Sequence, residues 1–84
     1  MHTIKGMTPA SVSDRIRDLR TTVHTAAQRP ADYRVIAACE REIAELTTGA
    51  AFMAAHMCIF HGDKPNVEQD IIDWSRAAFG MSVS

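Results

Sequence analysis

The stretch that decides the fold is Ile36–Phe60, IAACEREIAELTTGAAFMAAHMCIF. Its apolar residues recur at alternating three- and four-residue steps: Ile36, Cys39, Ile43, Leu46, Ala50, Met53, Met57 and Phe60. This heptad-like spacing, held over roughly three and a half repeats, is typical of one long helix that packs lengthwise against other helices. The stretch therefore predicts an all-α protein with a long helix over about residues 33–61.

The preceding residues predict a first helix over about residues 9–27. Thr8 suits the N-cap, and Pro9 suits the first helical position because its missing N–H would be unpaired there anyway. One apolar seam follows at helical spacing: Val12, Ile16, Leu19, Val23 and Ala26. Pro30 interrupts the pattern and Asp32 can cap the long helix. A connection this short predicts an antiparallel helical hairpin.

A third, shorter helix is predicted over about residues 66–79. Gly62 suits a helix C-cap, and Asn66 with Gln69 forms a candidate capping box. The apolar residues of this helix can fold back on the second half of the long helix: Val67, Ile71, Ile72, Trp74, Ala78 and Phe79. We therefore expect a single helical domain over residues 1–84, with residues 1–7 as an N-terminal arm.

The second half of the long helix carries apolar residues on every side except at His56, which is typical of a helix buried all round. A third helix of about 14 residues covers one side of it, and monomers rarely expose a continuous apolar patch of several hundred Å². The sequence therefore predicts a homodimer or higher homo-oligomer. The residues expected at its interface are Gly49, Phe52, Met53, His56, Met57, Phe60 and Trp74.

Composition argues against several partners and compartments. The formal net charge of −1 gives no long-range field to attract nucleic acid or an anionic membrane. The nearly uncharged stretch 49–60 is shorter than the ~20 residues that a membrane span needs. Cys39 and Cys58 would lie ~28 Å apart on one helix, too far to bridge. Free thiols and an N-terminus without a signal-peptide pattern predict a cytoplasmic protein.

Metal, cofactor and catalytic chemistry are not predicted. His56 and His61 would point to different sides of a helix, and Cys58 and His61 alone share a face, so a zinc site would need ligands from elsewhere. His56 is either hydrogen-bonded across an interface or a pH-sensitive or ligand-binding group, and the sequence does not separate these alternatives. The glutamates of the long helix form a solvated face, and the chain lacks phosphate-loop and hydrolase motifs, so we expect a non-enzyme.

Two further features leave alternatives open. Arg15, Arg17, Arg20, Arg29 and Arg34 interleave with aspartates, which favours a mixed solvated surface over a phosphate-binding patch. Gly49 costs about 1 kcal/mol relative to Ala inside a helix. Close approach of another backbone would offset this cost, and a kink or a small ligand cavity is the alternative.

Two short strings stand out, Ile4–Gly6 in the arm and Thr48–Met53 on the long helix. Together with the hairpin layout they are similar to the helical hairpin of phage anti-defence proteins that sequester cyclic nucleotide signals, whereas the third helix departs from that pattern. The resemblance implies an oligomer that binds ligands between subunits, and no binding residue is carried over from it.

From these observations we expect a small regulator or inhibitor that binds a protein partner, encoded by a phage or another mobile element. The alternative is an oligomeric protein that sequesters a small anionic ligand, such as a nucleotide signal, between subunits near Gly49 and His56.

Overall fold

The protein consists of three helices, α1 (Pro9–Ala26), α2 (Tyr33–Phe60) and α3 (Val67–Ala78). A computed structural model describes residues 6–28, 30–60 and 67–83 and contains no strand among them. The predicted all-helical class is confirmed, and each helix begins and ends within one residue of the predicted bound. The candidate capping residue Asn66 and most of the N-terminal arm lie outside the described residues.

The start of α1 follows from local hydrogen bonding. The Thr8 hydroxyl accepts a 3.1 Å hydrogen bond from the Ser11 backbone N–H, and the Thr8 N–H donates to the Ser11 hydroxyl at 3.0 Å. This reciprocal arrangement is a capping box that uses Ser in place of the usual Glu or Gln, and Pro9 follows at the first position. The predicted N-cap is confirmed.

The connection between α1 and α2 is closed by backbone and side-chain hydrogen bonds. The Asp32 N–H donates to the Ala26 carbonyl at 2.9 Å, which folds the chain back at the end of α1. The Asp32 carboxylate then accepts from the Val35 N–H at 3.2 Å, as an N-cap does. The cap predicted at Asp32 is therefore present.

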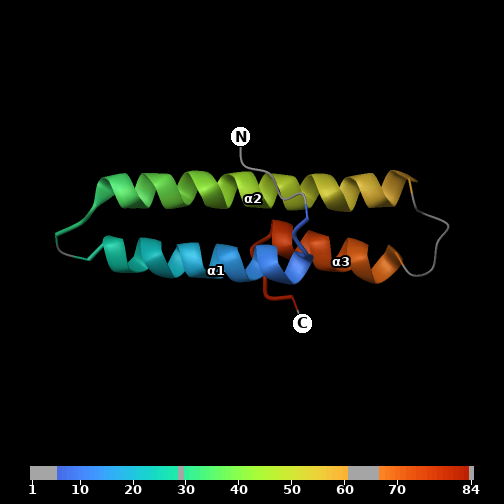
Figure 1. Ribbon diagram of the computed structural model, residues 1–84, viewed down its shortest axis with the longest axis horizontal. Coiled ribbons are helices and arrows are strands. Elements are labelled where there is room, and N and C mark those ends of the chain that lie inside the picture. Colours follow the sequence, from blue (N-terminus) through green and yellow to red (C-terminus); the bar gives the residue numbers. More distant parts are fainter. Residues whose placement is uncertain (1–5, 29, 61–66, 84) are drawn as a thin grey trace.

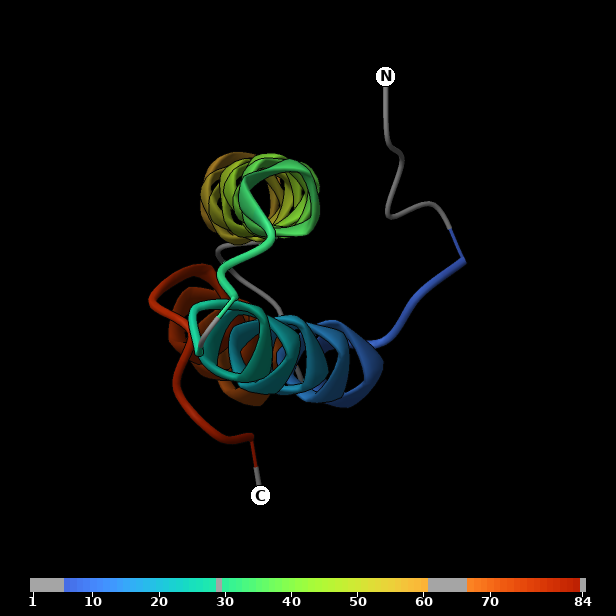
Figure 2. The ribbon, with the colours of Figure 1, turned by 90° about the vertical axis from the view of Figure 1, so that its left-hand side faces the viewer.

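Helix α2 forms one layer of the molecule, and α1 and α3 together form the other. Figure 1 shows α2 along the whole length, with α1 beside its first part and α3 beside its second part. Helix lengths explain this arrangement, because α2 has 28 residues, whereas α1 has 18 and α3 has 12, so neither shorter helix alone can cover it. The molecule measures 52 × 26 × 17 Å, and the end-on view in Figure 2 shows the two layers.

The core lies between these layers. It takes three residues from each longer helix and two from α3: Val12, Ile16, Leu19, Cys39, Leu46, Ala50, Trp74 and Ala77. The predicted seams of α1 and α2 supply the first six, so their inward faces are confirmed. Two residues of the set predicted to fold onto α2 from the third helix lie elsewhere: Ile72 is 44% and Phe79 76% exposed. Phe79 follows the last residue of α3, and buried Ala77 was missed.

Candidate functional site

The side of α2 that points away from the other two helices is exposed along its second half. Its exposed residues follow one another at helical spacing, and we call them the outer face of α2: Thr48, Ala51, Phe52, Ala55, His56, Cys58 and Ile59. Phe52 is 69% and Ile59 74% exposed. Among the described residues no other element covers this side, since α1 and α3 both pack against the opposite side of α2.

Large and small side chains are combined on the outer face. The rings of Phe52 and His56 stack with their centroids 6.2 Å apart and their planes inclined by 21°. Ala51 and Ala55 lie beside them and keep the backbone accessible. The sequence from Leu46 to Phe60 contains no Asp, Glu, Lys or Arg, so the face carries no carboxylate, ammonium or guanidinium group. The arrangement can accept another helix at close distance.

The predicted interface residues occupy three kinds of position. Phe52 and His56 lie on the outer face. Gly49, Met53 and Met57 are half-buried, and Met53 and Met57 pack against the core. Trp74 is 4% exposed and belongs to the core between α3 and α2. The side chain of Phe60 lies outside the described residues.

The candidate metal ligands are not brought together in the described part of the chain. Cys39 is buried, Cys58 is exposed, and both thiols are free. Among residues 6–28, 30–60 and 67–83, no three His, Cys, Asp or Glu side chains converge. His61, the third member of the candidate cluster, lies outside these residues.

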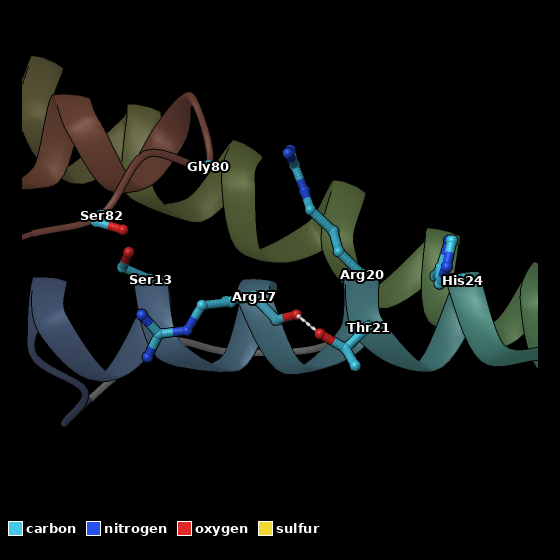
Figure 3. Close-up of a pocket in the computed structure, with 7 residues that line it drawn as sticks. All are labelled: Ser13, Arg17, Arg20, Thr21, His24, Gly80 and Ser82. Atoms are coloured by element: carbon cyan, nitrogen blue, oxygen red, sulfur yellow. Dashed lines mark hydrogen bonds between the residues drawn. The ribbon is translucent and has the colours of Figure 1, made fainter.

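A second feature is a hollow of about 410 Å³ between α1 and the segment that follows α3. Figure 3 shows the residues that line it, with Ser13 and Ser82 at one end and His24 at the other. Five residues on one face of α1 contribute at helical spacing, and the segment after α3 closes the remaining side. The lining residues are Ser13, Arg17, Arg20, Thr21, His24, Gly80 and Ser82.

Gly80 and Ser13 hold the segment after α3 in place above α1. Gly80 has φ of +73°, and backbone hydrogen bonds from Gly80 N–H to Ala77 O (3.0 Å) and from Met81 N–H to Arg76 O (2.8 Å) close the end of α3. This is a Schellman motif, in which glycine supplies the left-handed residue. The buried Ser13 hydroxyl then donates a 2.7 Å hydrogen bond to the Met81 carbonyl.

The hollow is positively charged on its α1 side. Arg17 donates to the Asp14 carboxylate at 2.6 Å. Arg20 has no hydrogen-bond or ion-pair partner among the described residues, and its guanidinium lies directly against Gly80. Sequence reasoning placed Arg17 and Arg20 in a mixed surface and missed this hollow. Their helical spacing was visible, but the approach of residues 80–82 depends on the tertiary packing of α3.

Comparison with models of known protein families, with curated proteins and with solved structures finds no match to this chain. Within the described residues, no helix has both the length and the apolar character that crossing a bilayer requires.

Proposed function

We propose that the protein is a small, non-enzymatic helical interaction protein that self-associates through the outer face of α2. In this proposal an antiparallel hairpin of α1 and α2, completed by α3, is the unit of a homo-oligomeric bundle. The observation that carries the proposal is the exposure of Phe52 and Ile59 on an uncharged helix face. Burying such side chains contributes about 1.5–3 kcal/mol each, which favours association.

A second copy of the chain suits this face for two physical reasons. Because the face carries no carboxylate, ammonium or guanidinium group, apposing it to itself brings no like charges together. Ala51 and Ala55 allow two helices to approach closely, while Phe52 and Ile59, seven residues apart on one side of the alanines, provide the larger contacts. A two-fold axis across the face would pair these elements reciprocally, as an isologous dimer requires.

The assembled protein then acts by binding another protein as a regulator or inhibitor. The residues of α2 that remain exposed beside the dimer contact would form part of that binding surface. The alternative function, capture of a small anionic ligand between subunits near Gly49 and His56, requires the same association. A cation is needed there for such a ligand, and Arg or Lys side chains from the chain ends would supply it.

Native mass spectrometry combined with sedimentation velocity tests the proposal. We expect the unmodified chain to be a dimer or higher oligomer, and Phe52→Glu to shift it to a monomer with unchanged helical circular dichroism. Tyr33→Glu is the matched control, because Tyr33 is an aromatic residue at the start of the same helix that is at least as exposed as Phe52 (78% against 69%) and lies outside the face. This variant should assemble as the unmodified chain does.

Three results test the proposed self-association and distinguish it from ligand capture between subunits. A strictly monomeric unmodified chain overturns the proposed association, and so does a Phe52→Glu variant that still assembles fully. An oligomer that retains the additional mass of a small molecule, lost in Phe52→Glu, supports ligand capture between subunits.

A further inference from the structure

We propose that the hollow between α1 and the segment after α3 binds the phosphate group of a small phosphate-bearing molecule. The site consists of Ser13, Arg17, Arg20, Thr21 and His24 on α1, and of Gly80 and Ser82 opposite them. It lies on α1 rather than on the outer face of α2, so it is independent of self-association. Its volume of about 410 Å³ lies within the range common for small-molecule sites.

The arrangement of charge is the first argument. Arg17, Arg20 and His24 follow one another at steps of three and four, so they share one side of α1 although aspartates alternate with arginines in the sequence. Asp14 is the carboxylate in contact with this group, and it binds Arg17 alone. The planar guanidinium groups of arginine bind phosphate oxygens in pairs through parallel N–H donors.

The position of Arg20 is the second argument. A Cβ atom at residue 80 would lie 2.9 Å from the Arg20 Cζ, so the glycine that ends α3 also makes room for this guanidinium. Arg20 is held beside the hollow without a carboxylate partner among the described residues. A cation placed in this way is available to a ligand, because no ion pair has to be broken first.

The hydrogen-bond donors around the hollow favour a phosphate over a carboxylate as the ligand group. The hydroxyl protons of Ser13 and Thr21 already go to the carbonyls of Met81 and Arg17. The remaining donors come from different sides of the hollow: the two guanidinium groups, the His24 ring and the Ser82 hydroxyl. A phosphate monoester has three terminal oxygens to accept from such a set, whereas a carboxylate has two.

Titration of the ¹⁵N-labelled protein with phenyl phosphate, inorganic phosphate and benzoate at constant ionic strength tests this proposal. We expect saturable amide shifts confined to residues 13–24 and 80–82, with phenyl phosphate binding more tightly than inorganic phosphate and benzoate more weakly than both. If inorganic phosphate binds as tightly as phenyl phosphate, the site is one for the free ion, and the small-molecule proposal is overturned. Shifts that do not saturate or that spread over the surface also overturn it.

Two charge-matched variants separate a built site from general attraction. Arg20→Gln removes the unpaired guanidinium and should weaken phenyl phosphate binding about tenfold or more, as expected for a hydrogen bond to a charged group. Arg41→Gln removes the same charge from an exposed position of α2 outside the hollow and should leave the affinity unchanged. Equal losses in both variants, or no loss in Arg20→Gln, contradict the proposal.

Discussion

The Arg15 guanidinium and the Glu42 carboxylate join α1 to α2 through two hydrogen bonds, from Nε to Oε2 at 2.6 Å and from Nη2 to Oε1 at 3.2 Å. The hydrogen bond and the charge of Glu42 raise the pKa of Arg15 above its ordinary value. While Glu42 is ionised, this raised pKa adds stability that is present below the unfolded pKa of Arg15 and is lost as pH rises through the folded pKa; protonation of Glu42 by acid also removes it. The guanidinium therefore stays charged, and salt can weaken the pair at neutral pH.

Glu42→Gln should lower the free energy of unfolding by about 0.5 kcal/mol, since Arg15 is half exposed and exposed pairs contribute little. A double-mutant cycle with Arg15→Gln, measured by urea unfolding at low and high salt, isolates the pair. The Asp14–Arg17 pair within α1 is more exposed and should show a smaller coupling. A coupling that is larger at high salt would contradict an electrostatic contact.

Gly80→Ala should destabilise the protein by about 1–2 kcal/mol, because an L-residue is strained at this positive φ and its Cβ meets Arg20. Gly6→Ala provides the control, since Gly6 also has a positive φ (84°) but nothing lies within 4 Å of its added Cβ. Thermal unfolding of both variants separates strain from collision. An additional Arg20→Ala change should restore part of the stability lost in Gly80→Ala. If stability is not restored, the contact between the added Cβ and Arg20 does not contribute to the loss.

Trp74→Ala should cost about 3–5 kcal/mol, the range for removing a buried aromatic side chain. The free energy of unfolding of a small domain is about 5–15 kcal/mol, so this loss is a large fraction of the total. Because Trp74 is a core residue that holds α3 against α2, α3 should open first. Hydrogen exchange is expected to show lost protection in α3 before α1. Phe79→Ala, at a residue 76% exposed, should change stability by less than about 0.5 kcal/mol. Equal effects at the two aromatic residues would refute the placement of Trp74 in the core.

Ser13→Ala should lower stability by about 1 kcal/mol, the net contribution of a typical hydrogen bond, and should increase hydrogen exchange at residues 81–83. Ser75→Ala removes a bond of the same length, from the Ser75 hydroxyl to the Ile71 carbonyl within α3. This control should leave exchange at residues 81–83 unchanged. Unaltered exchange in Ser13→Ala would mean that the bond does not hold the segment.

The helices could be predicted from the sequence because their signals are local. Thr8, Pro9 and Asp32 identify helix starts through their own hydrogen bonding and φ restrictions, and the periodic seams identify the inward faces of α1 and α2. The short third helix was placed correctly, but its inward face was assigned less well. Ile72 is exposed and adjoins half-buried Ile71 in the sequence, and hydrophobicity does not distinguish the two neighbours.

The sequence predicted the two candidate sites less well than the helices. The physical reason differs between the outer face of α2 and the hollow. The lengths of the helices predicted that one side of α2 would lack cover but did not identify its residues, because Phe52 is exposed whereas Met53 and Met57 pack against the core. The hollow forms between residues separated by more than 50 positions, such as Arg20 and Gly80. Its existence depends on the direction in which the chain leaves α3, which the Schellman turn and the Ser13 hydrogen bond set together.

Sharing α2 between α1 and α3 also has a consequence during synthesis, because α1 and α2 are made before α3. The first part of α2 meets its partner through a connection of a few residues, so the loop to be closed is short. The second part has no partner layer until α3, which follows it in the chain, has formed and turned back. Until then both sides of this part of α2 are open to water, and the interval in which the chain is most prone to aggregate ends when Trp74 docks.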